Sequence, residues 1–268
     1  MEISPSGQKS SSGFMTLGAG GYYTYPVAPG VSLFANGYGE YKFHGKDEVK
    51  PIEIGNYTAA GGVSVIRDEN VYRVSLNYGV VTLGSEKFRS SAGIAGEWQY
   101  QFDERQAVSL GAQFAALRYS DVNNATGSDQ RDADFYGLSA GYRRIFSHAL
   151  QPILSVGLSY GDQQSRMGRR DLVSRVAGVN IGLSFTPAAQ WGVALGYGHL
   201  KSDYKDRDIF IGETRHDRYD TAHATLSYLI SRNVSIRGEV QRSKNRSNIA
   251  IYSFPRDLYA VKLRYEFK

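Results

Sequence analysis

The chain has no cysteine, which excludes disulfide bonds, cysteine-ligated zinc, iron–sulfur clusters and thiol nucleophiles. It has only 7 proline and 3 methionine residues among 268. No run of about 18 apolar residues occurs, so no transmembrane helix is predicted. The first five residues lack the basic and apolar regions of a signal peptide. If the protein is exported, we expect this sequence to be a mature or truncated form.

Charge of neither sign is concentrated in one part of the chain. The 31 basic and 26 acidic residues give a net charge of +5, and the two signs are interspersed. No helix-turn-helix, RNA-recognition or zinc-finger pattern accompanies this small surplus. We therefore expect no nucleic-acid partner.

The abundant feature is alternation of apolar and polar residues, from residue 13 to the end. In VYRVSLNYGV (71–80), every second residue is apolar, and Arg, Ser, Asn and Gly lie between them. These runs exceed the ~5–6 residues of a globular strand and reach the ~9–11 of a membrane-spanning strand. Thirteen runs are present: 13–25, 31–44, 54–67, 71–84, 87–102, 106–121, 132–147, 150–163, 172–186, 190–204, 217–230, 233–245 and 256–267.

Two architectures would use such strands differently. A soluble β-sandwich would pack the apolar faces together, yet these positions carry many Tyr and Ala, and no repeat period favours a β-solenoid. A membrane barrel would turn the apolar faces to lipid and the polar faces to a lumen. The sequence therefore predicts an all-β, transmembrane, antiparallel up-and-down β-barrel over residues 13–268. We expect it in the outer membrane of a Gram-negative bacterium.

The expected turns differ between the two ends of the strands, as in outer-membrane barrels. Those at one rim are short: Pro26–Gly30, Asp68–Asn70, Asp103–Arg105, Ser147–Leu150, Pro187–Gln190 and Arg232–Asn233. Most of those at the other rim are longer: Gly45–Pro51, Asn123–Asp132, Asp162–Asp171, Asp203–Asp217 and Lys244–Pro255. Aromatic residues collect near both rims, where the lipid headgroups would lie.

The strand number is expected to be even, as in bacterial single-chain barrels. We predict about 14 strands, with about 12 as the second choice. Residues 1–12 contain Pro5, Gly7 and a serine cluster, and are expected to form an N-terminal loop or truncated segment. An odd count of runs implies either that a preceding strand is missing from this chain or that one run has been split or missed.

The closing segment, RSNIAIYSFPRDLYAVKLRYEFK (246–268), resembles that of outer-membrane barrels linked to periplasmic tetratricopeptide repeats. This group includes the surface lipoprotein assembly modifiers and, more distantly, exopolysaccharide secretion porins. The matching loop residues are Ser247, Asn248, Tyr252 and Arg256. Tyr265 and Phe267 are similar to the terminal signal recognised by the barrel assembly machinery, although Lys268 follows the Phe. No helical 34-residue period is present, so the repeat domain is absent from this chain.

This resemblance implies a conduit that carries a polypeptide, such as a surface lipoprotein, or another polymer from the periplasm to the cell surface. A passive diffusion porin for small solutes is the alternative. The implied partners are outer-membrane lipid, lipopolysaccharide, the barrel assembly machinery, and a periplasmic repeat domain or translocated substrate. No enzymatic activity, cofactor or metal is expected.

Charged residues on the polar faces are the candidates for a functional lumen, where they would tune passage or form ion-pair networks. They are Arg73, Glu97, Arg143, His223, Arg237, Glu239, Lys262, Arg264 and Glu266. His223 and Thr225 also suggest a lipid hydrolase with histidine as base. Against that activity, Thr replaces the usual Ser and His223 shares the polar face.

Two loop features complete the candidates. Arg166, Arg169 and Arg170 could hold lipopolysaccharide phosphates, because guanidinium pairs bidentately with phosphate, or could simply be solvated. Asp203, Asp206 and Asp208 are oxygen donors for calcium, but their spacing is not that of an EF-hand and basic residues interrupt it.

Overall fold

A computed structural model describes residues 2–3, 9–10, 13–45, 53–120 and 128–267. The expected loops 45–51 and 123–132 lie partly outside these residues, and Lys268 lies wholly outside them. No helix in the described part of the chain has the length and hydropathy of a membrane-spanning helix.

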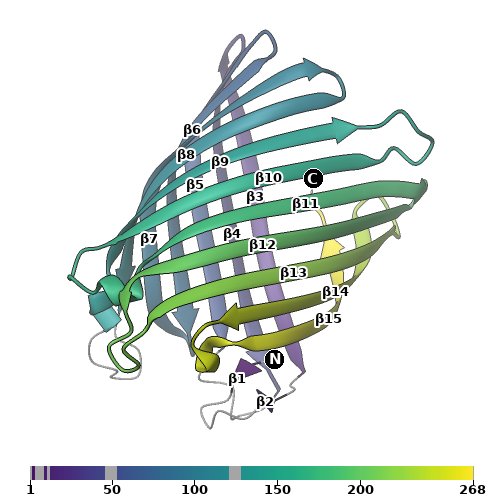
Figure 1. The fold of residues 1–268 in the computed structure, drawn as a ribbon. Helices are drawn as coiled ribbons and strands as arrows, with labels where there is room; N and C mark the ends of the chain where they lie inside the picture. Colours follow the sequence, from purple (N-terminus) through teal and green to yellow (C-terminus); the bar gives the residue numbers. More distant parts are fainter. Residues whose placement is uncertain (1, 4–8, 11–12, 46–52, 121–127, 268) are drawn as a thin grey trace.

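The described chain forms one thirteen-stranded antiparallel sheet that curls into a barrel (Figure 1). Each strand pairs with the next along the chain, which is the up-and-down topology predicted from the sequence. The strands are β3 (Phe14–Ala28), β4 (Val31–His44), β5 (Ile54–Arg67), β6 (Asn70–Leu83), β7 (Glu86–Asp103), β8 (Gln106–Tyr119), β9 (Ala133–Ile145), β10 (Ile153–Ser165), β11 (Ser174–Ala188), β12 (Trp191–Arg207), β13 (Thr214–Leu229), β14 (Val234–Ser247) and β15 (Phe254–Tyr265).

The thirteen strands coincide with the thirteen alternating runs, whereas an even number had been expected. Several strands continue further toward the long-loop rim than the sequence predicts. The expected loop Asp203–Asp217 shrinks to residues 208–213, and Asp203 pairs with His216. The sequence did not predict these strand ends, because they carry charged residues in place of the apolar–polar alternation. Strands of a barrel wall extend beyond the hydrocarbon region, and apolar residues are not needed there.

The first residues differ from the expected loop. β1 (Glu2–Ile3) and β2 (Lys9–Ser10) form a small two-stranded antiparallel sheet of their own. The register pairs Glu2 with Ser10 and Ile3 with Lys9.

The odd number of strands fixes the relative direction of the first and last strands of the sheet, β3 and β15. Because consecutive strands are antiparallel, β3 and β15 run in the same direction. Within the described chain these two strands are not hydrogen-bonded to each other, so the sheet has two free edges. Direct pairing between them would be parallel, unlike every other pair in the sheet.

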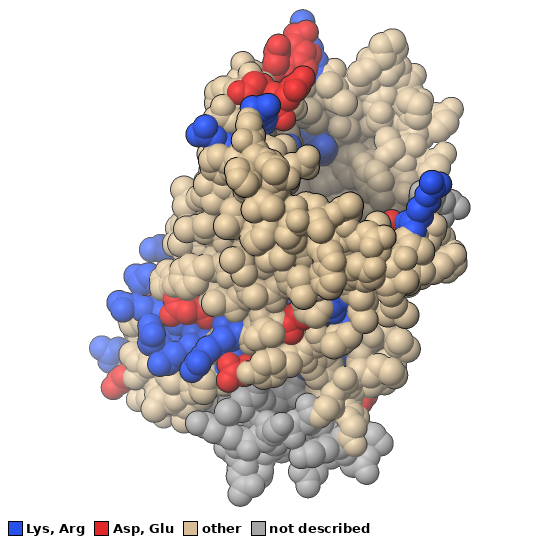
Figure 2. All heavy atoms as spheres, turned by 90° about the vertical axis from the view of Figure 1, so that its right-hand side faces the viewer, with Lys and Arg blue, Asp and Glu red and all other residues tan. Residues whose placement is uncertain are grey.

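The two faces of the sheet have opposite characters. Large apolar side chains on the outward face are exposed: Leu76 is 69% exposed and Val261 is 77% exposed. Among the described residues, the buried hydrophobic set is confined to Ala107, Leu117, Ala133, Val173 and Ile249. So small a set cannot form the packed layer of a soluble sandwich. Figure 2 shows uncharged surface across the middle of one side and charged side chains toward its two ends.

The two rims differ as expected. Residues 29–30, 68–69, 104–105 and 189–190 make tight turns at one rim. Gly30 has φ +72, and a Cβ there would collide with the backbone oxygen of Ile66, so this turn requires glycine. At the other rim, residues 84–85 also make a tight turn, while the connections 166–173, 208–213 and 248–253 are longer.

Candidate functional site: the bore and its long-loop rim

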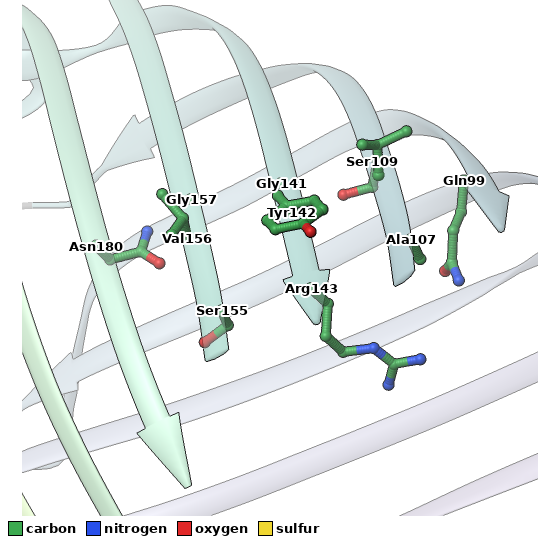
Figure 3. A pocket seen from close by; sticks show the side chains of 11 residues that line it. Gln99, Ala107, Ser109, Gly141, Tyr142, Arg143, Ser155, Val156, Gly157 and Asn180 are labelled. Atoms are coloured by element: carbon green, nitrogen blue, oxygen red, sulfur yellow. The ribbon is translucent and has the colours of Figure 1, made fainter. Parts of the chain in front are cut away.

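The polar faces of the strands line the inside of the barrel. On β9 to β11, Arg143, Ser155 and Asn180 lie around a hollow of about 350 Å³ in this inner wall (Figure 3). Gly141 and Gly157 line the same hollow. The inner wall therefore combines hydrogen-bonding groups with residues that occupy little of the bore.

Glycine on the inner wall leaves room for polar side chains of the neighbouring strands. A Cβ on Gly157 would lie 2.6 Å from Oδ1 of Asn180, and one on Gly196 would collide with the His223 ring. These two polar side chains thus lie along the wall, in the space that a glycine leaves on the neighbouring strand.

The predicted lumen charges form ion pairs along the wall. Arg73 on β6 faces Glu97 on β7 at 3.6 Å. Glu239 accepts from Arg237 on its own strand at 3.4 Å and from Lys262 on the neighbouring strand at 2.7 Å. Arg264 contacts Glu266 at 3.0 Å. Each of these pairs joins residues on one strand, on neighbouring strands or at a strand end, and none of them crosses the bore.

His223 lies on the inner wall, where it pairs in register with Gly196 and Gln241. In the described part of the chain no hydrogen bond or ion pair involves its ring. Thr225 stands opposite Glu239, whose carboxylate pairs with Arg237 and Lys262 and not with the imidazole. By contrast, His199 is on the outward face, where its Nδ1 lies 2.8 Å from Asp220.

The basic loop between β10 and β11 is largely neutralised by carboxylates. Arg166 forms a bidentate contact with Asp134 at 2.8 Å, and Arg169 does so with Asp171 at 2.8 to 2.9 Å. The hydrogen bond from Arg169 holds the pKa of Asp171 below its ordinary value. Arg170 lies in the short 3₁₀ helix η3 (Arg170–Leu172).

The three aspartates considered for calcium have separate partners. Asp203 contacts Lys201 at 2.7 Å and His216 at 2.8 Å. Asp208 accepts the backbone N–H groups of Phe210 and Ile211. Asp206 accepts from the backbone N–H of Arg207. No group of three potential metal ligands is found among the described residues.

The long-loop rim contains a cluster of one arginine, two tyrosines and one aspartate, of which the sequence analysis singled out only Tyr252. Arg215 stacks on the rings of Tyr204, 4.6 Å away, and Tyr252, 3.5 Å away. It also forms a bidentate pair with Asp217, which is only 7% exposed. Tyr252 lies in the 3₁₀ helix η4 (Ala250–Tyr252), so the cluster joins β12, β13 and the last loop. We call these four residues the rim latch.

The closing-segment residues singled out from the sequence support this latch. Asn248 accepts the backbone N–H of His216 at 2.7 Å and donates to the carbonyl of Thr214 at 2.9 Å. Tyr252 donates its O–H to Asp208 at 3.0 Å. The backbone N–H of Phe210 holds the pKa of Asp208 below its ordinary value, and burial raises that of Tyr252. The last loop is thus fastened to the connection between β12 and β13.

Substitution of Tyr252 should loosen this fastening in two steps. Tyr252→Phe removes the hydrogen bond to Asp208 and keeps the ring under Arg215, whereas Tyr252→Leu also removes the stacking, a loss of about 1 kcal/mol. We expect limited proteolysis within residues 208–213 and 248–253 to be faster in the Phe variant than in the wild type, and fastest in the Leu variant. Equal cleavage rates in all three proteins would contradict the latch.

The comparisons with known proteins fit this architecture. The family model of the outer membrane protein β-barrel domain matches residues 57–229, which is more than half of the chain. The chain belongs to this outer-membrane β-barrel family. A second model, putative beta-barrel porin 2, matches residues 197–267. The comparison with curated proteins gives no match.

Solved outer-membrane proteins share the fold at low sequence identity. An outer-membrane channel from Pseudomonas putida F1 is 12% identical, with a TM-score of 0.53 and 98% of each chain covered. The copper transporter OprC is 13% identical, with a TM-score of 0.52, 96% of this chain covered and 50% of that chain. OmpT of Vibrio cholerae is 9% identical, with a TM-score of 0.50, 94% of this chain covered and 95% of that chain. The protein is therefore a bacterial outer-membrane β-barrel with the architecture of channels and porins.

Aromatic residues of this outer-membrane barrel meet at its short-turn rim. The rings of Trp191 and Tyr228 are 4.8 Å apart, and those of Tyr265 and Phe267 are 4.6 Å apart. Tyr265 and Phe267, the expected assembly signal, are exposed. Their position fits the amphipathic preference of aromatic rings for the membrane interface.

Proposed function

We propose that this barrel is an aqueous conduit through which a polypeptide, such as a surface lipoprotein, or another hydrophilic polymer moves from the periplasm to the cell surface. The observation that carries the aqueous conduit is the inner wall: most of its residues are small or polar, and the ion pairs of Arg73, Glu239 and Lys262 run along the wall rather than across the bore. A polymer passing through the bore would meet hydrogen-bonding groups on the wall, and these ion pairs would not block its path.

The polymeric cargo is supported by the resemblance of the closing segment to repeat-linked translocators. Ser247, Asn248 and Tyr252 belong to that pattern. Asn248 and Tyr252 bind the last loop to the β12–β13 connection, and Ser247 accepts the backbone N–H of Ile249 within the last loop. A periplasmic repeat domain would deliver the cargo, and the barrel assembly machinery would insert the barrel. We propose no enzymatic step, because His223 has neither an orienting acid nor a hydrogen-bonded nucleophile among the described residues.

A passive porin for small solutes is the second candidate, favoured by the same polar bore. Planar-bilayer recording of the purified protein separates the two. A steady open current would favour the porin, and would count against the translocator. A silent membrane with rare brief openings would favour a translocator whose passage depends on a partner.

The ion selectivity of any open state follows from the charges of the inner wall. Basic residues outnumber acidic ones there. The basic set is Lys42, Arg73, Arg89, Arg143, Arg215, Arg237, Arg256, Lys262 and Arg264, and the acidic set is Glu40, Glu97, Asp217, Glu239 and Glu266. We expect a potassium chloride gradient to give a reversal potential of the sign for anion preference. Glu239→Gln should strengthen this preference, and a preference for cations would contradict the assigned inner face.

A further inference from the structure

A second group of charges lies on the opposite, outward face of the barrel. It occupies the ends of β11 to β14 nearest the long-loop rim, and we call it the outward basic patch. Figure 2 shows basic side chains gathered toward that end of the side wall. The patch consists of Arg175, Lys201, Arg218, Arg242, Lys244 and Arg246.

The strand register places three of these cations in one row. Lys201 on β12 stands directly opposite Arg218 on β13, and Arg218 stands directly opposite Arg246 on β14. Like charges at directly opposed positions destabilise a sheet. Such a row is therefore unfavourable unless anions neutralise it.

The acidic residues nearby neutralise the patch only in part. Asp203 contacts Lys201 at 2.7 Å, and Asp220 contacts Arg246 at 3.3 Å. Arg218 and Lys244 form no ion pair with any residue that the structure describes. Arg242 lies 3.8 Å from Asp257, and its side chain is 80% exposed. The patch thus keeps a surplus of positive charge directed away from the protein.

The patch lies immediately beyond the lipid-facing band of the same strands. Tyr160 stands opposite Ala177, which stands opposite Lys201. Tyr197 stands opposite Ala222, which stands opposite Arg242. Since tyrosine marks the headgroup level of a membrane, the basic groups lie at or just beyond that level.

We propose that the outward basic patch binds the phosphate groups of the anionic glycolipid, lipopolysaccharide, in the outer leaflet. The patch is positively charged and the lipid phosphates are negatively charged, and both lie at the headgroup level of the membrane. Arginine guanidinium groups bind phosphate oxygens bidentately. The patch takes the role first considered for the loop residues Arg166 and Arg169, which instead bind Asp134 and Asp171. The proposal rests on the long-loop rim facing the cell exterior and does not depend on what the bore transports.

The test compares two triple variants of the full chain purified in detergent. One is Arg218→Gln, Lys244→Gln, Arg246→Gln, which removes patch charges. The matched control is Arg166→Gln, Arg169→Gln, Arg170→Gln, which removes an equal charge from the loop. Each protein is titrated with lipopolysaccharide, with lipopolysaccharide stripped of its phosphates, and with inorganic phosphate.

We expect the patch variant to bind lipopolysaccharide about a hundredfold more weakly than the wild type, as for three surface cations near an anionic lipid. The control variant should bind almost as the wild type does, and the dephosphorylated lipid should not distinguish the three proteins. Equal loss in both variants, undiminished binding by the patch variant, or binding of inorganic phosphate as tight as that of the lipid would overturn the proposal.

Folding can be monitored in the same samples. Removing Arg218 and Arg246 relieves the repulsion in the row, so the patch variant should be no less heat-stable than the wild type in lipopolysaccharide-free detergent. Added lipopolysaccharide should then raise the unfolding temperature of the wild type more than that of the variant. A variant destabilised without the lipid would show that the row is a structural element, and would contradict its assignment as a lipid site.

Discussion

Leu158→Arg should lower the stability of the folded barrel in lipid by about 2–4 kcal/mol. Leu158 lies midway along β10 on the outward face and is exposed. A guanidinium there would have to leave water for hydrocarbon. This loss corresponds to a roughly 30- to 700-fold change in the ratio of folded to unfolded protein. Urea titration in phospholipid vesicles, followed by tyrosine and tryptophan fluorescence, would measure it.

The neighbouring residue supplies the control. Ser159 is adjacent in sequence and faces the bore, where its hydroxyl lies over Gly178. Ser159→Arg introduces the same side chain into a wet environment, and we expect a change within ~0.5 kcal/mol. If the two variants were destabilised equally, or if Ser159→Arg were the worse, the assignment of the two faces would have to be reversed.

Single cysteines should distinguish the bore from the lipid face with no background reaction, because the chain has no cysteine of its own. Ser155 lies on the inner wall beside the hollow formed with Arg143 and Asn180. After Ser155→Cys, a bulky water-soluble thiol reagent should react rapidly and reduce the single-channel current to a small fraction of its starting value. The adduct would project from the inner wall into the bore.

Val156→Cys is the matched position on the outward face, opposite Ile181 on β11. In lipid vesicles the same charged reagent should react with it slowly, and the current should be unchanged. Rapid labelling of Val156→Cys together with block of the current would contradict the barrel orientation. Where the bore is silent, the labelling rates alone make the same distinction.

Much of the fold follows from the sequence because one simple rule governs a membrane barrel. Each strand must satisfy its backbone hydrogen bonds with its neighbours and show one apolar face to lipid. The segment 72–80 alternates in this way at every position, and it lies within β6. The thirteen strands could be placed for this reason, without knowledge of any long-range packing.

The remaining features depend on register, which a single sequence does not display. Lys201, Arg218 and Arg246 lie far apart in the chain, and only the pairing of β12, β13 and β14 aligns them. The rim latch is similar, because Arg215 meets Tyr252 only through the folding of the last loop. The closing-segment motif did mark Tyr252, but it gave no indication of its partner.

The odd number of strands also determines how the barrel presents its ends. The sheet starts at Phe14 beside the long loops and finishes at Tyr265 beside the short turns. The chain therefore enters the sheet on one side of the bilayer and leaves it on the other. An epitope inserted just before Phe14 and one placed just after Tyr265 would be reached by antibodies from opposite compartments, which makes the pair a direct report of transmembrane orientation in intact cells.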